Sequence, residues 1–295
     1  MTALGSNNQR RLRQLSLGIA ASLASLALTG CDKTAWSGGE QQSASLSAGE
    51  RKPLGLMTSL PIYWPEAPEF DDLLAENAQA SWVRGAIEQA YAIQPLDVLD
   101  EASLAPLSHL ILAQPRALSG AENVALDAWV QAGGRVLIFA DPMLTQGSQF
   151  AFGDSRRPLG VALLSPILAR WGLELTFDEQ QNGDVRVARA FDMELPVKLA
   201  GAFRAKADMA RDEAEQTQCD LGPQGIVARC VIGAGFALII ADAALLEESR
   251  LEEGSGSDHS HGSKADGDHH SPEQSVSSEQ RAALDALLSM AFNPA

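Results

Sequence analysis

Four of the five histidines of the chain lie close together, in a segment that could bind a metal ion. They are His259, His261, His269 and His270, and they are accompanied by Asp258, Asp266 and Asp268. Imidazole and carboxylate groups are suitable ligands for Zn, Cu or Ni. The segment is also rich in Gly and Ser, so ordering it around an ion would cost conformational entropy. We therefore interpret residues 254–276 as a disordered, solvated loop, and a low-affinity site for Zn, Cu or Ni is the alternative. No other cofactor is indicated.

The sequence offers no arrangement that is typical of nucleophilic catalysis. Neither Gly-x-Ser-x-Gly nor Gly-x-Cys-x-Gly occurs, although a strand-to-helix elbow of this kind would be expected in a hydrolase of the α/β class. Cys230, the candidate nucleophile, lies inside an apolar strand. His109, the candidate base, is the first residue of another apolar strand, and we favour a structural role at the strand end over a role as general base. Glycine-rich nucleotide-binding motifs are also missing from the sequence. We predict that the chain is not an enzyme.

Polar and aromatic residues follow several predicted strands and define a candidate surface. Ligands of open α/β sheets bind outside the carboxyl ends of the strands. The residues expected there are Tyr63, Trp64, Asp141, Asp154, Arg156 and Arg157. Tyr, Trp and Arg are frequent anchors at protein interfaces, so a partner-protein surface is favoured over a small-ligand site.

The sequence from Ser108 to Pro142 predicts a strand, a helix and a second strand. These elements would position the candidate surface, because its residues follow the strands. The apolar run 109–113 is followed by Ser119 and Glu122, which have the spacing of a capping box. Val124, Ala128 and Trp129, with Ala125 and Ala132, are expected to share the buried face of the helix, which Gly133 and Gly134 terminate. Residues 135–140 form the second strand. Two apolar strands joined by a helix predict a parallel βαβ unit.

The flanking segments extend this unit. A strand is expected over 53–59, an amphipathic helix over 80–91, an edge strand over 92–98, a turn or helix over 101–106 and a helix capped by Ser165. Further strands are expected over 173–177, 185–191, 195–200, 226–232 and 236–241, with a helix opening at Asp242 and a last helix that docks Leu284, Leu287 and Leu288 on the sheet. A hairpin centred between Gln224 and Gly225 would place Cys219 opposite Cys230, which makes a cross-strand disulfide plausible. The predicted fold is therefore α/β, with a doubly wound, mostly parallel sheet and an antiparallel β-hairpin extension.

Composition limits the partners of such a domain. Of the 295 residues, 45% are hydrophobic, so the chain can form a core, and the net charge is −16. An acidic surface of this kind argues against binding to nucleic acid, whose phosphates require Lys and Arg.

The N-terminus has the features of an export signal. Arg10, Arg11 and Arg13 precede an apolar stretch, residues 15–28, that is too short to span a bilayer as a helix. Leu28-Thr29-Gly30-Cys31 resembles the lipobox of bacterial lipoproteins, in which the signal is cleaved before the Cys and the Cys receives acyl chains such as palmitate; a plain signal peptide is the alternative. Removing residues 1–30 would remove three Arg and no acid, which changes the net charge from −16 to −19. By resemblance to enterobacterial lipoproteins, Asp32 directly after Cys31 implies the periplasmic face of the inner membrane, with the outer membrane as the alternative.

The stretch that contains Pro115, Ser119, Gly133-Gly134 and Asp141-Pro142 resembles the extracytoplasmic domain of gliding-motility-type auxiliary ABC transporter proteins. The segment 236–243 is similar to the closing strand of that family. The resemblance covers about residues 53–180 and implies a class I amidotransferase-like, Rossmann-like fold without catalytic residues. Members of that family usually carry transmembrane helices, whereas this chain has a predicted lipid anchor, which points to an auxiliary role.

These observations together predict a membrane-anchored lipoprotein of the cell envelope that is a non-catalytic accessory of an ABC-type transport or envelope system. The expected parts are a signal peptide (1–30), a flexible tether (31–52), the α/β domain (53–253), the His-rich loop (254–276) and a C-terminal helix (277–295). The expected partners are the membrane, through Cys31, and ABC transporter subunits or other envelope proteins. A solute- or metal-binding receptor and a degenerate hydrolase or amidotransferase are the alternatives.

Overall fold

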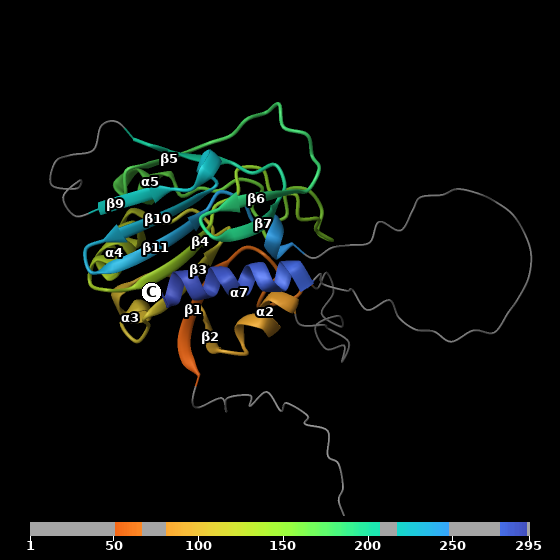
Figure 1. The fold of residues 1–295 in the computed structure, drawn as a ribbon. Helices are drawn as coiled ribbons and strands as arrows, with labels where there is room; N and C mark the ends of the chain where they lie inside the picture. Colours follow the sequence, from red (N-terminus) through yellow and green to blue (C-terminus); the bar gives the residue numbers. More distant parts are fainter. Residues whose placement is uncertain (1–50, 67–80, 207–216, 248–277, 294–295) are drawn as a thin grey trace, which may run out of the picture. The chain divides into compact units, whose positions relative to one another are not determined.

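The computed structural model describes residues 51–66, 81–206, 217–247 and 278–293 (Figure 1). The predicted signal peptide, Cys31, most of the tether and the histidines of the loop 254–276 lie outside the described residues. Among the described helices, none combines the length and the apolar character that crossing a bilayer requires.

The described residues form one central sheet of seven strands (Figure 1). From one edge to the other, its strands are β2 (Tyr91–Pro95), β1 (Lys52–Thr58), β3 (His109–Ala113), β4 (Arg135–Phe139), β11 (Gly235–Ile240), β10 (Val227–Ile232) and β9 (Thr217–Leu221). The first five strands run parallel to one another, β10 is antiparallel to β11, and β9 is antiparallel to β10. The predicted α/β character, with a mostly parallel sheet and an antiparallel extension, is confirmed.

Helices cover both faces of this sheet, which explains why its strands are continuous apolar runs. Helices α2 (Trp82–Ile87) and α7 (Ser278–Phe292) pack on the face of the sheet to which Ile111 of β3 belongs. Helices α3 (Glu101–Leu104), α4 (Gly120–Gln131) and α5 (Ser165–Arg170) pack on the other face with Leu110 and Leu112. Figure 1 shows α7 lying across the strands, and its predicted buried residues Leu284, Leu287 and Leu288 do face the sheet.

Two small antiparallel pairs accompany the sheet. β5 (Leu173–Thr176) pairs with β8 (Ala202–Ala205), a strand that the sequence analysis did not identify, and β6 (Arg186–Ala190) pairs with β7 (Met193–Val197). Two short 3₁₀ turns lie next to the last two strands: η1 (Pro223–Gly225) precedes β10, and η2 (Ala244–Leu246) follows β11. Between β9 and β10, Cys219 lies opposite Cys230 and is joined to it by a disulfide.

Helix α4 begins and ends as expected but presents a different face. Ser119 and Glu122 form the capping box, and Gly133 adopts a positive φ of 113° just after the helix. The expected stripe is wrong in part: Ala125 and Trp129 pack against the core, but Val124 is 70% exposed, and Leu126 and Val130 are the fully buried residues. The buried face also carries the carboxylates of Glu122 and Asp127, which interrupt its apolar pattern.

Three element boundaries also differ from expectation. Ser165 is the first residue of α5 rather than its cap, since Leu164 occupies that position. The helix expected over 80–91 ends at Ile87, because Tyr91 pairs with Lys52 as the start of β2. The helix expected to open at Asp242 is the single turn η2.

Candidate binding site at the carboxyl edge of the sheet

The strand order places a crevice between β1 and β3. From β1 the chain proceeds to β2 on one side, whereas from β3 it proceeds to β4 on the other side, so the loops diverge at the carboxyl ends of β1 and β3. Such a switch point is where open α/β sheets bind ligands. A cavity of about 610 Å³ opens at this place. Its lining comes from the end of β1 and from the loops after β1, β2, β3 and β4: Met57, Thr58, Ser59, Leu60, Pro61, Tyr63, Trp64, Pro65, Glu66, Leu96, Asp97, Arg116, Phe150, Ser155, Arg156 and Arg157. We call it the carboxyl-edge pocket.

Gln114 holds the ends of the strands that surround this pocket. It directly follows β3, is fully buried and has a φ of 47°, so its side chain points back toward β4. Its Nε2 donates to the carbonyls of Asp141 (3.0 Å) and Leu159 (2.8 Å), and its Oε1 accepts from the backbone N–H of Asp141 (2.9 Å). Every polar atom of this amide is thus paired. The sequence analysis missed this residue, although a polar side chain directly after a fully apolar strand is the signal that marks it.

Ser59 attaches the loop after β4 to β1. Its hydroxyl donates to the carbonyl of Gln114 (2.6 Å) and accepts from the backbone N–H of Leu159 (3.1 Å). Both functions of the hydroxyl are therefore structural. The result is that the loop carrying Arg156 and Arg157 lies against the pocket.

Of the six residues predicted for this surface, Tyr63, Trp64, Arg156 and Arg157 line the pocket. The rings of Tyr63 and Trp64 meet edge to face at 4.9 Å, and Trp64 is 67% exposed. The guanidinium of Arg156 lies over the ring of Phe150 at 4.1 Å.

Asp154 contributes indirectly, by orienting Arg156. Its two oxygens accept from Nε (3.0 Å) and Nη2 (2.7 Å) of Arg156, a two-point ion pair. These hydrogen bonds lower the pKa of Asp154 to about 2. Asp154 itself is not among the residues that line the pocket.

Arg157 is half-buried and differs from its neighbour in having no carboxylate at ion-pair distance within the described part of the chain. It donates to the carbonyl of Phe150, and its guanidinium lies 4.7 Å from the ring centre of Phe152. Phe152 is itself 95% exposed.

Asp141 was predicted to lie on this surface, and the structure corrects that prediction. Its side chain is fully buried at the end of β4, where Oδ1 accepts from the N–H of Met143 (2.7 Å) and Oδ2 from the N–H of Ala243 (3.0 Å). Burial raises the pKa of Asp141 to about 6, against the lowering effect of these two hydrogen bonds. Asp242, which follows the neighbouring strand β11, is also buried, and burial and the charge of Asp141 raise its pKa well above the usual value. The carboxyl group of Asp141 thus connects the end of β4 to the residues after β11, and that of Asp242 accepts the N–H of Lys198 after β7.

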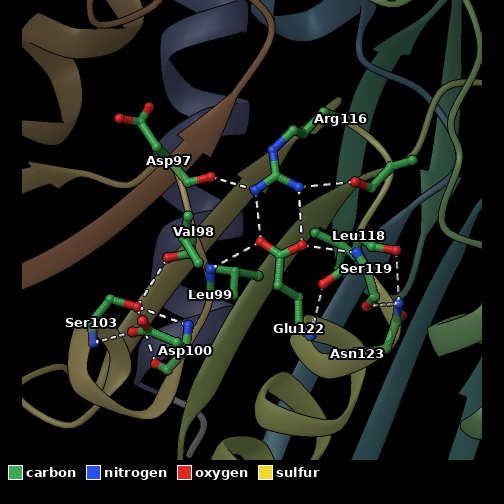
Figure 2. A network of polar contacts seen from close by, with 11 residues as sticks. Asp97, Val98, Leu99, Asp100, Ser103, Arg116, Leu118, Ser119, Glu122 and Asn123 are labelled. Atoms are coloured by element: carbon green, nitrogen blue, oxygen red, sulfur yellow. Dashed lines mark hydrogen bonds and ion pairs between the residues drawn. The ribbon is translucent and has the colours of Figure 1, made fainter.

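One wall of the pocket is held by the ion pair of Arg116 and Glu122, which Figure 2 shows. Nη2 of Arg116 lies 2.6 Å from Oε1 of Glu122, and Nη1 lies 3.0 Å from Oε2. Arg116 also donates to the carbonyl of Asp97, and Glu122 accepts from the N–H of Leu99 (3.2 Å). The hydrogen bond from Arg116 is the main cause that lowers the pKa of Glu122 to about 2. The sequence analysis used Glu122 only as a capping residue and did not identify Arg116.

His109, for which the sequence favoured a strand-end role over that of a general base, lies at the amino end of β3, the end opposite to the pocket. Its ring is buried between Tyr91 and Phe292, and Nδ1 is 2.8 Å from the hydroxyl of Ser108. Burial lowers the pKa of His109. Within the described ranges, no group of three or more His, Cys, Asp or Glu side chains could hold a metal ion.

Comparison with sequence families gives one match. Residues 51–192 match the family described as an ABC-type uncharacterized transport system, an auxiliary ABC transporter family. This range contains every residue that lines the carboxyl-edge pocket. A search of the curated proteins finds no match.

Solved structures resemble the chain only remotely. A β-galactosidase from Rahnella sp. R3 is 12% identical with a TM-score of 0.35 and covers 65% of this chain and 29% of its own. An exo-β-1,4-mannosidase from Opitutaceae bacterium strain TAV5 is 13% identical with a TM-score of 0.38 and covers 65% and 31%. A cytoplasmic protein from Salmonella typhimurium is 8% identical with a TM-score of 0.36 and covers 65% and 87%. This chain spans less than a third of the two glycosidases, and likenesses of this degree carry no information on activity.

Proposed function

Because residues 51–192 carry a domain of the auxiliary ABC transporter family, we propose that this chain is a non-catalytic accessory component of an ABC-type transport system. We further propose that it binds its partner at the carboxyl-edge pocket. The observation that carries this proposal is that the matched segment supplies all of the residues that line the pocket. Because the pocket is formed entirely by the domain that defines the family, we propose that partner binding takes place there.

Exposed aromatic side chains at the pocket support a protein partner. Trp64 is 67% exposed and Phe152 is 95% exposed, although aromatic rings of this size are normally covered by other protein atoms. Arg156 and Arg157 lie against aromatic rings beside them. Tyr, Trp and Arg dominate the binding energy of protein interfaces, so this combination suits a transporter subunit.

A binding role agrees with the state of the Ser59 hydroxyl, which lines the pocket. Ser59 is engaged on both sides by backbone groups, and the only imidazole among the described residues, His109, lies at the other end of the sheet. We propose that the domain has an amidotransferase-like, doubly wound fold and that it catalyses no reaction.

The lipobox-like residues 28–31 support a location for this component. We propose that the chain is a lipoprotein whose lipidated Cys31 anchors it at the periplasmic face of the inner membrane, with the outer membrane as the alternative. Several acyl chains on one Cys would hold the protein firmly, whereas a single chain binds membranes only marginally.

Purification from the native membrane in mild detergent tests the accessory role. The wild-type chain should bring an ABC permease or ATPase subunit with it, and a Trp64→Ala/Phe152→Ala double variant should lose most of that subunit. Val124→Ala is the matched control, because Val124 is 70% exposed on α4, away from the pocket, and should retain the partner. A chain that arrives alone with bound solute or metal would contradict the accessory role and favour the receptor alternative.

A further inference from the structure

The carboxyl-edge pocket has an apolar floor and a charged rim. Met57, Leu60 and Leu96 line it and are each less than 10% exposed, so their side chains belong to the core as well as to the cavity. The rings of Tyr63, Trp64 and Phe150 continue this apolar lining. A concave apolar surface with a few polar groups at its edge is the usual form of a small-molecule site.

The three guanidinium groups on the rim are not equivalent. Arg116 presents two nitrogens to Glu122, and Arg156 presents two to Asp154, so each of these cations already has a carboxylate. Arg157 has a backbone carbonyl and the face of Phe152; Asp154 interacts with it through its charge but forms its ion pair with Arg156, and no carboxylate of the described residues lies at ion-pair distance from Arg157. A half-buried guanidinium is stabilised when an anion takes its remaining N–H groups, and its planar fork matches an acid group.

Two acidic residues on the same rim limit the charge that a ligand can carry. Asp97 and Glu66 both line the pocket, and Oε2 of Glu66 accepts the N–H of Gln149 at 2.7 Å. A ligand with several negative charges would be repelled by these carboxylates and by the strongly acidic protein, whereas one acid group is matched by Arg157.

We propose that the carboxyl-edge pocket binds an amphipathic organic monoanion. Its acid group pairs with Arg157, and its apolar body lies against Trp64 and the floor formed by Met57, Leu60 and Leu96. This inference goes beyond the proposed function, because it assigns to the pocket a small-molecule ligand in addition to the protein partner proposed above.

A pair of fluorescent probes that differ in one charge tests this assignment on the full chain. The probe 8-anilinonaphthalene-1-sulfonate is an aromatic monoanion, and N-phenyl-1-naphthylamine has the same aromatic body without the sulfonate. The sulfonate probe should bind at a single saturable site and at least tenfold more tightly than the neutral probe. Arg157→Gln should weaken the sulfonate probe at least tenfold and leave the neutral probe within twofold. Arg189→Gln is the matched control, since Arg189 is an exposed arginine of β6 that pairs with Glu194 of β7, and it should change neither.

Two further variants keep the test decisive if Arg157→Gln unfolds. Arg157→Lys retains the charge and should keep most of the sulfonate affinity, and Trp64→Ala, at an exposed position, should weaken both probes. Equal affinity of the two probes, or sulfonate binding that is unchanged in a folded Arg157→Gln variant, would overturn the assignment, as would the absence of binding by either probe. If the sulfonate binds through Arg157 but no transporter subunit co-purifies, the accessory role is refuted and the ligand class is retained. If a transporter subunit co-purifies but the sulfonate does not bind through Arg157, only the ligand class is refuted.

Discussion

The side chain of Gln114 and the backbone of Asp141 form a reciprocal pair of hydrogen bonds that joins the ends of β3 and β4. The amide nitrogen donates to the carbonyl of Asp141 at 3.0 Å, and the amide oxygen accepts its N–H at 2.9 Å. A third hydrogen bond, to Leu159, connects this junction to the loop that carries Arg156 and Arg157. One buried amide thus positions two strand ends and one wall of the pocket.

Replacing Gln114 should therefore destabilise the domain. Gln114→Ala leaves the buried N–H of Asp141 without its acceptor and removes the donor to the carbonyl of Leu159, whereas the carbonyl of Asp141 keeps its hydrogen bond from the N–H of Ala162; we expect a loss of about 2 kcal/mol in the free energy of unfolding. Denaturant titration of both proteins measures this loss. Gln94→Ala, at an exposed position on the edge strand β2, is the control and should stay within about 0.5 kcal/mol of wild type. A Gln114→Ala variant as stable as the control would show that the junction is dispensable.

Asp141 should make the domain less stable as the pH rises through neutrality. Its folded pKa of about 6 lies above the usual value of 3.8, so the folded state holds the proton more tightly than the unfolded state. The resulting stabilisation is complete below pH 4 and is lost as the pH rises through 6, by about 3 kcal/mol in total. The raised pKa of Asp242 acts in the same direction. Free energies of unfolding at pH 4 and pH 7.5 measure the effect.

Asp141→Asn should flatten this pH dependence, because the amide does not ionise. Asp285→Asn, on the exposed side of α7, is the control and should retain the wild-type slope. If the slope of Asp141→Asn equalled that of wild type, Asp141 could not be its source.

Glu122 should act on the acid side of the stability profile. Its pKa is lowered from 4.5 to about 2, so the stabilisation is present above pH 4.5 and is lost as the pH falls toward 2. Because Arg116 is 46% exposed, solvent screening reduces the effect, and we expect Glu122→Gln to cost about 2 kcal/mol at pH 7. Glu88→Gln breaks the partly exposed i,i+4 pair with Arg84, which lies within one helical turn, and should cost at most about 0.5 kcal/mol. Comparable losses in the two variants would refute the special role of the network in Figure 2.

Gly235 should not tolerate a side chain, because α4 packs directly on the start of β11. A Cβ atom at this position would clash with the backbone carbonyls of Val130 and Gly134. We expect Gly235→Ala to lower the free energy of unfolding by about 2 kcal/mol. At Gly85, inside α2, a Cβ would meet no atom within 4 Å, so Gly85→Ala should be neutral or stabilise by up to about 1 kcal/mol. Thermal unfolding compares the two variants, and equal midpoints would contradict the close packing of α4 on β11.

The central strands of the sheet were predictable because their residues are buried on both faces. The continuous apolar runs of β3 and β4 mark them without any knowledge of their neighbours. The orientation of α4 was not predictable in the same way, since Glu122 and Asp127 occupy its buried face. Each is satisfied by distant partners, Leu99 for Glu122 and the indole of Trp171 for Asp127 (2.9 Å), which no local pattern indicates.

The pocket was predicted in part for a similar reason. Its edge and four of its residues followed from the rule that loops after parallel strands converge. Asp141 was misplaced because its carboxyl group turns inward to cap the N–H groups of Met143 and Ala243. Arg116 was missed because its role depends on Glu122 and on Asp97, which lies at the end of a different strand.

Site-specific photo-crosslinking in the native membrane tests the central proposal most directly. A photoreactive amino acid placed at position 64, on the rim of the carboxyl-edge pocket, should crosslink to a permease subunit of an ABC system. The same amino acid at position 124, on the exposed side of α4, should not crosslink to that subunit. A crosslink that appears equally at both positions, or a transporter subunit captured only from position 124, would contradict a partner-binding role for the pocket.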